Sequence, residues 1–527
     1  AKSAESNKYD PMPGTKRSFV ALDDTKGYYF KTFTLKAIGD KAEVWVADDL
    51  AFPQEDRNDS LKITDAQIQY VLSEFDNNIY EKDTEFFGTP DSHTGENQDP
   101  LITENFGKDY YMSTDNSDRN LILVDNVRDE NFYDPTFPNY IAGFYSPTLE
   151  LYTDRNIITI DAYDWANRVG SDVARPHLYE GTVAHEYQHL IHDDNDSNEE
   201  TWINEGMSDF AEYLVGYGHP DGHVDYFRDH PENSLVAWED QGPIEVLADY
   251  GNAYLFQLYL YDHFGEQFIR SLAKDTKQGI ESVDDTLKKF GYKETFEDVY
   301  RAYQTALVID DKKRENYSFK SIDFTINTDT DEAYNTPGAP AWGSDFITLE
   351  RSKKQHLFFD GIDFRPTEWS VMKDPENQDN EVLWGGDGSL ADHFLVKPVD
   401  LSNVKNAELT FDTWYDIEEN WDYGFVQVST DGGETWTSLA NEHTRGDLDP
   451  NAHPKVVANV PGFTGKSDGW QTETFDLSQY SGQKVLIAFR YVTDWATEEA
   501  GWYIDNIRVD AVGFGNDGRS IDDFQSL

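Results

Sequence analysis

The first third of the chain contains short apolar runs of the kind that form β-strands. Residues 27–49 hold two alternating runs separated by Gly39 and Asp40, and this pattern predicts a β-hairpin. After Thr64 the apolar spacing becomes helical and stops at Gly88, so a helix is expected there. Other runs predict three more strands, at 119–127, 137–147 and 155–163.

The middle of the chain, from about residue 177 to 310, follows a helical period instead. Apolar residues recur every three or four positions, which is typical of helices with one buried face. Four segments show this spacing, at 177–194, 199–217, 250–275 and 282–310. Because strands come first and helices follow in one block, an α+β domain is expected.

Beyond about residue 316 the alternation of strands returns, between clusters of Gly, Pro, Asn and Asp. This spacing is typical of an antiparallel β-sandwich. The alternating runs are 345–350, 355–360, 407–415, 424–430, 484–492 and 501–509. The predicted organisation has five parts, namely a β-rich segment at 1–60, an α+β domain at 61–315, a connecting β segment at 316–365, a β-sandwich at 366–511 and a tail at 512–527.

Composition narrows the possible functions. Aromatic residues make up 14% of the 527 residues, enough to build buried cores despite only 38% hydrophobic residues. The formal net charge of −58 repels phosphate groups, so nucleic-acid binding is excluded as the main function. No apolar run approaches the roughly 18 residues of a membrane span. Cysteine is absent, so any metal must be bound by histidines and carboxylates.

The acidic composition fits two habitats: a secreted protein kept soluble in high salt or calcium, or an acidic protein with no special habitat. The first residues lack the basic and apolar stretches of a signal peptide. They are expected to be a processed N-terminus, although an intracellular or trimmed chain would look the same.

The strongest chemical signal is the pentapeptide His185-Glu186-Tyr187-Gln188-His189. On a helix, residues four apart share one face, so both imidazoles can bind one metal ion. Glu186 lies beside them, near enough to hydrogen-bond a water molecule on that metal. The pattern therefore predicts a catalytic metal site with a general base.

A catalytic zinc needs a third protein ligand, and Glu205 on the next predicted helix is the best candidate. Asp209, one turn later, could hydrogen-bond the free nitrogen of a ligand histidine and so orient it. The rival ligands are His192, Asp193, Asp194 and Asp196.

These motifs resemble a known group of enzymes. The stretches HEYQH at 185–189 and WINEGMSDFAEYL at 202–214 are similar to the motifs of the gluzincin metallopeptidases. What the resemblance implies is zinc on His185, His189 and Glu205, with Glu186 as general base. The stretch YGNAYLF at 250–256 resembles the gluzincin helix whose leading tyrosine stabilises the oxyanion, which implies that role for Tyr250.

The same resemblance places a substrate-binding edge strand at residues 142–145, Ala-Gly-Phe-Tyr. Gluzincin aminopeptidases carry a glutamate there that binds the substrate's free amine. No glutamate stands in this stretch, which favours an endopeptidase.

The layout as a whole is most similar to the immune inhibitor A-like secreted bacterial proteases, with the hyicolysin-type proteases close behind. Stretches at 383–402, 409–436 and 501–509 resemble the MAM-type jelly roll of the first group. The resemblance covers most of residues 120–511. It implies an α+β zincin-like metallopeptidase domain followed by an all-β jelly-roll or β-sandwich (MAM-like) domain.

Two other features lie in the C-terminal half. Residues 429–436 fit the Asp-box pattern, expected to be a hairpin turn in which Asp431 bonds the turn backbone and Trp436 packs below. Carboxylates near strand ends could bind structural calcium, or could simply be solvated. The candidates for calcium are Asp387, Asp392, Glu418, Asp422 and Asp505.

The sequence thus predicts a secreted zinc endopeptidase, from a bacterium and possibly from a saline habitat, that hydrolyses proteins or peptides. Two alternatives stay open. One is a zinc aminopeptidase, and the other is a non-catalytic surface or adhesion module. In either case the β-sandwich could bind a protein or a glycan.

Overall fold

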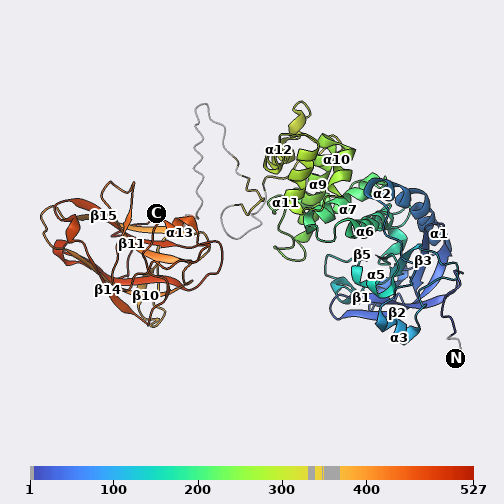
Figure 1. The fold of residues 1–527 in the computed structure, drawn as a ribbon, viewed down its shortest axis with the longest axis horizontal. Helices are drawn as coiled ribbons and strands as arrows, with labels where there is room; N and C mark the ends of the chain where they lie inside the picture. Colours follow the sequence, from blue (N-terminus) through green and yellow to red (C-terminus); the bar gives the residue numbers. More distant parts are fainter. Residues whose placement is uncertain (1–4, 330–338, 347, 349–367, 527) are drawn as a thin grey trace. The chain divides into compact units, whose positions relative to one another are not determined.

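The computed structural model describes residues 5–329, 339–346, 348 and 368–526. It divides the chain into two compact units, residues 1–350 and residues 351–527 (Figure 1). The predicted strand at 355–360 and part of that at 345–350 lie outside the described residues. Among the residues that the structure describes, no helix combines the length and apolar character needed to cross a membrane.

The first unit contains a six-stranded mixed sheet. Its strands are β1 (Lys16–Asp23), β2 (Gly27–Ile38), β3 (Ala42–Ala47), β4 (Asn120–Asp125), β5 (Gly143–Tyr145) and β6 (Ile157–Asp161). The order is β1-β2-β3-β4-β6-β5, in which β3, β4 and β6 are parallel and β5 is an antiparallel edge strand. Because β3 pairs with β4, the predicted β-rich segment at 1–60 shares its sheet with the rest of this unit.

Helices form the rest of the first unit. The first of them begins at Thr64, whose hydroxyl accepts a hydrogen bond from the backbone of Gln67 while the Gln67 side chain bonds back to Thr64. This helical stretch ends at Gly88, whose φ of +113° favours glycine. The helices are α1 (Asp65–Glu74), η2 (Phe75–Ile79), α2 (Tyr80–Phe87), α3 (Pro100–Phe106), α4 (Glu130–Tyr133), α5 (Pro147–Thr153), α6 (Leu178–Asn195), α7 (Thr201–Leu214), α8 (Asp221–Asp229), α9 (Val246–Phe264), α10 (Glu266–Leu272), α11 (Gly279–Lys289) and α12 (Phe296–Ile309), with short 3-10 turns η1 (Glu55–Ser60), η3 (Trp165–Asn167) and η4 (Glu315–Tyr317).

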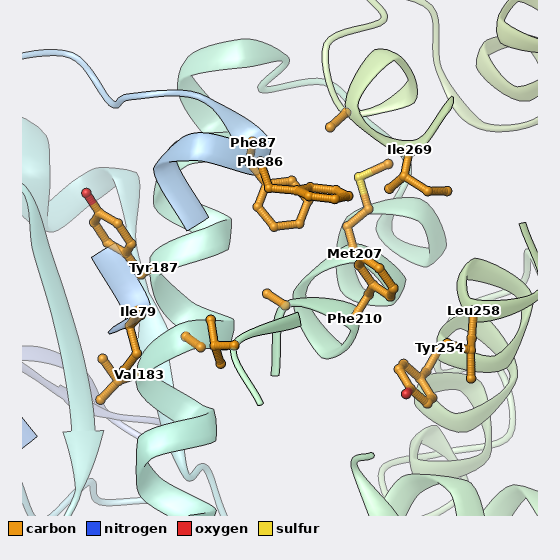
Figure 2. Close-up of a cluster of buried hydrophobic side chains, with 14 of the residues drawn as sticks. Ile79, Phe86, Phe87, Val183, Tyr187, Met207, Phe210, Tyr254, Leu258 and Ile269 are labelled. Carbon is orange, nitrogen blue, oxygen red and sulfur yellow. The ribbon is translucent and has the colours of Figure 1, made fainter. Parts of the chain in front are cut away.

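Helix α6 lies between the sheet and the other helices. It packs on β5 and β6 on one side and on α2 and α7 on the other, and α7 packs in turn on α9 (Figure 1). Figure 2 shows this core: Tyr187 of α6 lies beside α2 and η2, and Phe210 of α7 packs on Phe86 of α2 with 5.8 Å between ring centroids. Burial of both faces of α6 removes large apolar areas from water and holds its polar residues in fixed places.

The predicted connecting β segment at 316–365 is only partly described, at residues 316–329, 339–346 and 348, and stays a prediction for the rest. Its described residues contain no β-strand. Instead, Phe319, Phe324 and Ile326 are buried against the helices, and the backbone N–H of Ile326 donates to the carbonyl of Leu307 in α12. The described residues 316–329 therefore pack on the helices without pairing into a sheet.

The second unit is a β-sandwich. Its residues 371–522 have the all-β architecture that the sequence predicts. One sheet has the order β13-β10-β16-β8-β7, with β14 on β10 and β17 on β16, and the other has the order β12-β11-β15-β9-β18. The strands are β7 (Ser370–Lys373), β8 (Glu381–Trp384), β9 (Asp392–Asp400), β10 (Glu408–Ile417), β11 (Tyr423–Ser429), β12 (Thr437–Ser438), β13 (Gly465–Lys466), β14 (Gln471–Asp476), β15 (Lys484–Val492), β16 (Gly501–Val509), β17 (Phe514–Asn516) and β18 (Gln525–Ser526). Alternate residues of β10 are buried, as expected for a strand with one face on a core.

The sandwich extends past residue 511, where the sequence pattern ended it. Strand β17 pairs with β16, and β18 pairs with β9, so residues 512–527 are not a separate tail. Each of these strands is only two or three residues long, too short to show an alternating pattern.

The Asp-box stretch has the predicted structural role. The Asp431 carboxylate accepts a hydrogen bond from the backbone N–H of Thr435 and another from the Ser429 hydroxyl. The Trp436 ring packs against Phe394, with 5.4 Å between ring centroids. This turn joins β11 to β12.

Candidate metal centre and active site

Helix α6 carries the first half of the candidate site. Its apolar residues, among them Val183, Tyr187 and Leu190, are buried on two sides. The histidines at 185 and 189 therefore share the remaining face, one turn apart. Helix α7 packs across this face and supplies the second half.

Three side chains from these helices converge. The Nε2 atoms of His185 and His189 lie 3.1 Å apart, and each lies 3.1 Å from the Oε2 atom of Glu205. Two imidazoles and one carboxylate are the donor set of many catalytic zinc sites, and atoms this close can share one ion. The residues present fit a zinc ion.

Close packing of α7 on α9 sets the position of Glu205. A Cβ atom on the neighbouring Gly206 would lie 2.7 Å from the carbonyl oxygen of Ala253 in α9. Only glycine allows the two helix backbones to approach this closely. Glu205 is thereby held against the histidine face of α6.

The other nitrogen of each histidine also has a partner. The Nδ1 atom of His189 lies 2.9 Å from the Oδ1 atom of Asn204, and the Nδ1 atom of His185 lies 2.9 Å from the Oδ1 atom of Asp209. The second oxygen of Asp209 lies 2.6 Å from Nδ1 of His223 in α8. These partners orient both rings so that the Nε2 atoms point to the common centre.

Asp209 was predicted for this role, whereas Asn204 and His223 were not. Asn204 directly precedes Glu205, so its position in the motif was a usable signal. His223 follows α7 by a loop, and nothing in the local sequence distinguishes it.

Glu186 lies beside the triad, between α6 and the edge strand β5. It is 7% exposed, and burial raises the pKa of its carboxyl above the usual value. The two histidines oppose this rise, and so does a hydrogen bond from the backbone of Tyr145. Such a carboxylate holds a proton more readily than an exposed one, which suits a group that accepts and returns a proton.

The edge strand approaches Glu186 because residue 143 is glycine. A Cβ atom there would lie 2.7 Å from Cγ2 of Thr182 and 2.8 Å from the carbonyl oxygen of Thr159. The structure thus places residues 143–145 at the sheet edge next to the candidate site. An edge strand has free backbone groups that can pair with an extended peptide.

Tyr250 of α9 lies beside the triad, near His185. Its ring centroid is 6.4 Å from that of His185, and it stacks on His223 at 4.5 Å. Burial, and then the carboxylates of Glu205 and Asp209, raise the pKa of Tyr250 well above its usual value. The hydroxyl therefore keeps its proton and can donate a hydrogen bond.

The charges within the triad are strongly coupled. Burial raises the pKa of Glu205, but His189 and His185 outweigh this effect and hold the pKa at about 2. Burial raises the pKa of Glu212, beside His185, above its usual value. Glu205 is therefore ionised at neutral pH, as a metal ligand must be.

The rival ligands lie elsewhere. His192 is buried, 3.4 Å from the Gln188 amide, and burial lowers its pKa to about 4. Asp193 accepts a hydrogen bond from the Tyr145 hydroxyl, Asp194 lies near His93, and Asp196 lies near the Gln278 amide. The structure brings none of these four to the point where His185, His189 and Glu205 meet.

The predicted calcium residues of the sandwich do not form one cluster. Glu418 and Asp422 come together, with Asp494 as a third carboxylate that sequence reasoning missed. Asp392 instead pairs with Arg490 at 2.7 Å and with Lys455 at 2.9 Å. Asp505 accepts from Asn380, while Asp387 joins none of the metal-capable groups among the described residues. Calcium at Glu418 and Asp422 stays a prediction.

Comparison with known proteins bears on the second unit. Residues 371–522 match the family model described as "Immune inhibitor A-like, MAM domain". The chain is 31% identical over 119 residues to the pre-pro-metalloprotease PrtV of Vibrio cholerae and 30% identical over 115 residues to immune inhibitor A of Bacillus thuringiensis. It is also 27% identical over 115 residues to bacillopeptidase F of Bacillus subtilis.

These matches are partial. They cover 23%, 22% and 22% of this chain and only 12%, 15% and 7% of the three relatives in the same order. A solved GH115 glucuronidase structure aligns with a TM-score of 0.13 at 8% identity over 73% of this chain and 51% of that one, too low to indicate a shared fold. The chain is an N-terminal α+β region with a mixed sheet, followed by an all-β sandwich that matches the MAM domain of the immune inhibitor A-like proteins.

Proposed function

We propose that this chain is a zinc-dependent endopeptidase. The observation that carries the proposal is the convergence of His185, His189 and Glu205, whose donor atoms lie 3.1 Å from one another. Chance packing rarely brings two imidazoles and a carboxylate to one point and also fixes the outer nitrogen of each ring. Two of the partly matching relatives, named a metalloprotease and immune inhibitor A, support the proposal through the second unit.

Each residue has a role in peptide hydrolysis. A zinc ion bound by the triad supplies Lewis acidity toward the scissile carbonyl and lowers the pKa of the attacking water. The Glu186 carboxylate takes the proton from that water at its Oε atom and passes it to the leaving amine. Its raised pKa favours this exchange, because an effective acid–base group titrates near the working pH.

Tyr250 and the edge strand complete the site. The protonated Tyr250 hydroxyl donates a hydrogen bond to the oxygen that becomes negatively charged in the transition state. Strand β5 holds the substrate backbone in an extended conformation beside Glu186. Residues 142–145 contain no carboxylate to bind a free amine, so cleavage within a chain is favoured over removal of its first residue.

A single substitution tests the proposal. Glu186→Gln keeps the shape of the side chain but removes the base, so casein hydrolysis should fall about 10²- to 10⁴-fold while zinc stays bound. The exposed Glu281→Gln on α11 is the control and should hydrolyse casein at the unaltered rate. Full proteolysis by the Glu186→Gln protein would refute the assignment, as would an unaltered rate after zinc is removed with a chelator.

Two alternatives have distinct outcomes in the same assay. An aminopeptidase would hydrolyse peptides with a free amine and leave amine-blocked peptides intact. A surface or adhesion module would bind zinc and hydrolyse neither. Secretion stays a prediction from the sequence resemblance.

A further inference from the structure

A second cluster of metal-binding side chains lies near the C-terminal end of α6. It comprises His93 from the loop after α2, Glu150 from α5 and Asp194 from α6. One donor atom of each lies within 4.8 Å of the others, close enough to share one ion. None of the residues of the proposed mechanism belongs to this cluster.

A partner on its Nδ1 atom fixes the orientation of the His93 ring in this cluster. The Nδ1 atom of His93 lies 2.8 Å from Oδ1 of Asp154, and the other oxygen of Asp154 accepts a hydrogen bond from the backbone of Asn97. Asp154 is only 9% exposed, so its position is well defined. The Nε2 atom of His93 is thereby directed at Glu150, whose Oε1 atom lies 3.1 Å away.

This carboxylate–imidazole pair repeats the arrangement of Asp209 and His185 in the first site. A histidine that ligates a metal through Nε2 is usually held by such a partner on Nδ1. The orientation of His93 is therefore independent support for a cation, beyond the presence of acidic groups.

The charges around His93 are unbalanced. Three carboxylates lie around one imidazole, at Glu150, Asp154 and Asp194. Within the described part of the chain, none of the three forms an ion pair with a lysine or arginine. The negative charge of these carboxylates is therefore not balanced by a basic side chain in that part of the chain.

We propose that His93, Glu150 and Asp194 bind a second divalent ion of the first-row transition series, for which zinc is the probe. Imidazole is a good ligand for zinc and its neighbours in the series, whereas calcium prefers an all-oxygen set. This site is separate from the catalytic triad, and the proposal holds whether or not the protein is a peptidase.

Such an ion would cross-link three segments of the first unit: the loop after α2, helix α5 and helix α6. It would also act on the edge strand, because the Tyr145 hydroxyl donates to both Glu150 and Asp193. The second ion is therefore a structural clamp beside the strand that faces Glu186.

Zinc counting on the full-length protein tests the proposal. After equilibration at a buffered free zinc concentration, the wild type should hold two equivalents. The variants His93→Gln and Asp194→Asn should each hold one, and so should Glu205→Ala, which removes a ligand of the first site. The control is His443→Gln, because His443 pairs with Glu473 at 2.8 Å outside any metal-capable group, and it should hold two.

The pattern of losses separates the two sites. One equivalent in the wild type that is lost in Glu205→Ala and retained in His93→Gln would overturn the second site and leave the proposed function intact. Binding of calcium but not zinc by Glu205→Ala would also overturn it. Two equivalents in His93→Gln would do the same.

Melting curves show whether a variant has lost zinc binding or has simply misfolded. In the Glu205→Ala background, only the second site remains, so zinc should raise the melting temperature by at least about 2 °C. Adding His93→Gln to that background should abolish the rise, while Asp154→Asn should weaken zinc binding by about 10- to 100-fold. If zinc still raises the melting temperature without His93, the proposal is contradicted. His93 would then act only as a charged bridge between carboxylates.

Discussion

The Oδ1 atom of Asn204 lies 2.9 Å from the Nδ1 atom of His189, and Asn204 directly precedes Glu205 in α7. One turn of α7 therefore carries both a candidate ligand, Glu205, and the side chain that contacts a second candidate ligand, His189. Asn204 contacts the Nδ1 side of the His189 imidazole and Glu205 contacts its Nε2 side. The two adjacent residues of α7 therefore act on one ring.

Replacement of Asn204 by alanine should weaken zinc binding without removing a ligand. We expect the affinity to fall about 10- to 100-fold, since the His189 ring loses the contact that fixes its orientation. Zinc titration against a competing chelator measures the change. The control is Asn77→Ala, whose side chain bonds only within its own helical stretch, and an equal loss there would show that the effect is not local.

Replacement of Tyr250 by phenylalanine should lower kcat about 10²- to 10³-fold with little change in KM. The hydroxyl is protonated and faces the triad, so its loss removes stabilisation that exists only in the transition state. Steady-state kinetics on a quenched fluorescent peptide measure both constants. Tyr292→Phe, at an exposed position, is the control. A loss confined to KM would assign Tyr250 to substrate binding instead.

Replacement of Gly143 by alanine should destabilise the first unit by about 1–3 kcal/mol. The added methyl group meets Thr182 and the Thr159 carbonyl, so β5 must move away from α6. Urea unfolding gives the free energy, and peptide hydrolysis should fall as well. Gly222→Ala, with no atom within 4 Å of the added Cβ, is the matched control. Unchanged stability of the Gly143 variant would mean that β5 shifts at no cost.

Replacement of Asp249 by asparagine should stabilise the protein in a pH-dependent manner. Burial raises the pKa of Asp249 to about 7 in the folded protein, against roughly 4 in the unfolded chain. Between these values the unfolded chain has released the proton and the folded protein retains it, so wild-type stability falls as the pH rises.

The gain from Asp249→Asn should therefore be small near pH 4, grow up to pH 7 and then level off, reaching at most about 4 kcal/mol. Urea unfolding at several pH values measures it. Asp225→Asn, at an exposed site, should show no such trend. A gain that is constant with pH would indicate a change in packing rather than in ionisation.

Much of the fold could be predicted from local patterns. The hairpin around Gly39, the helix between Thr64 and Gly88 and the Asp-box turn were all correctly predicted, because each depends on residues close together in the chain. Strand β1 was not identified as a separate element, and β17 and β18 were missed as parts of the sandwich. Their pairing partners, rather than their own sequences, make them strands.

The candidate sites show the same difference between features set by local sequence and features set by tertiary packing. The spacing of His185 and His189 along one helix was enough to predict a shared metal, since the helical repeat alone puts them on one face. Glu205 was predicted from its motif on the next helix. Whether it would meet the histidines depended on how α7 packs between α6 and α9, where Gly206 lets α7 approach the backbone of α9 closely.

By itself, the sequence determined the candidate metal-binding helix, the types of its candidate ligands and the order of an α+β region before a β-sandwich. These follow from periodicity and side-chain chemistry, which act over a few residues. Only the tertiary structure placed His223 behind Asp209 and brought His93, Glu150 and Asp194 to one point. Those residues are distant in the chain and carry no common pattern, because contacts between separate segments are set by packing of the whole unit.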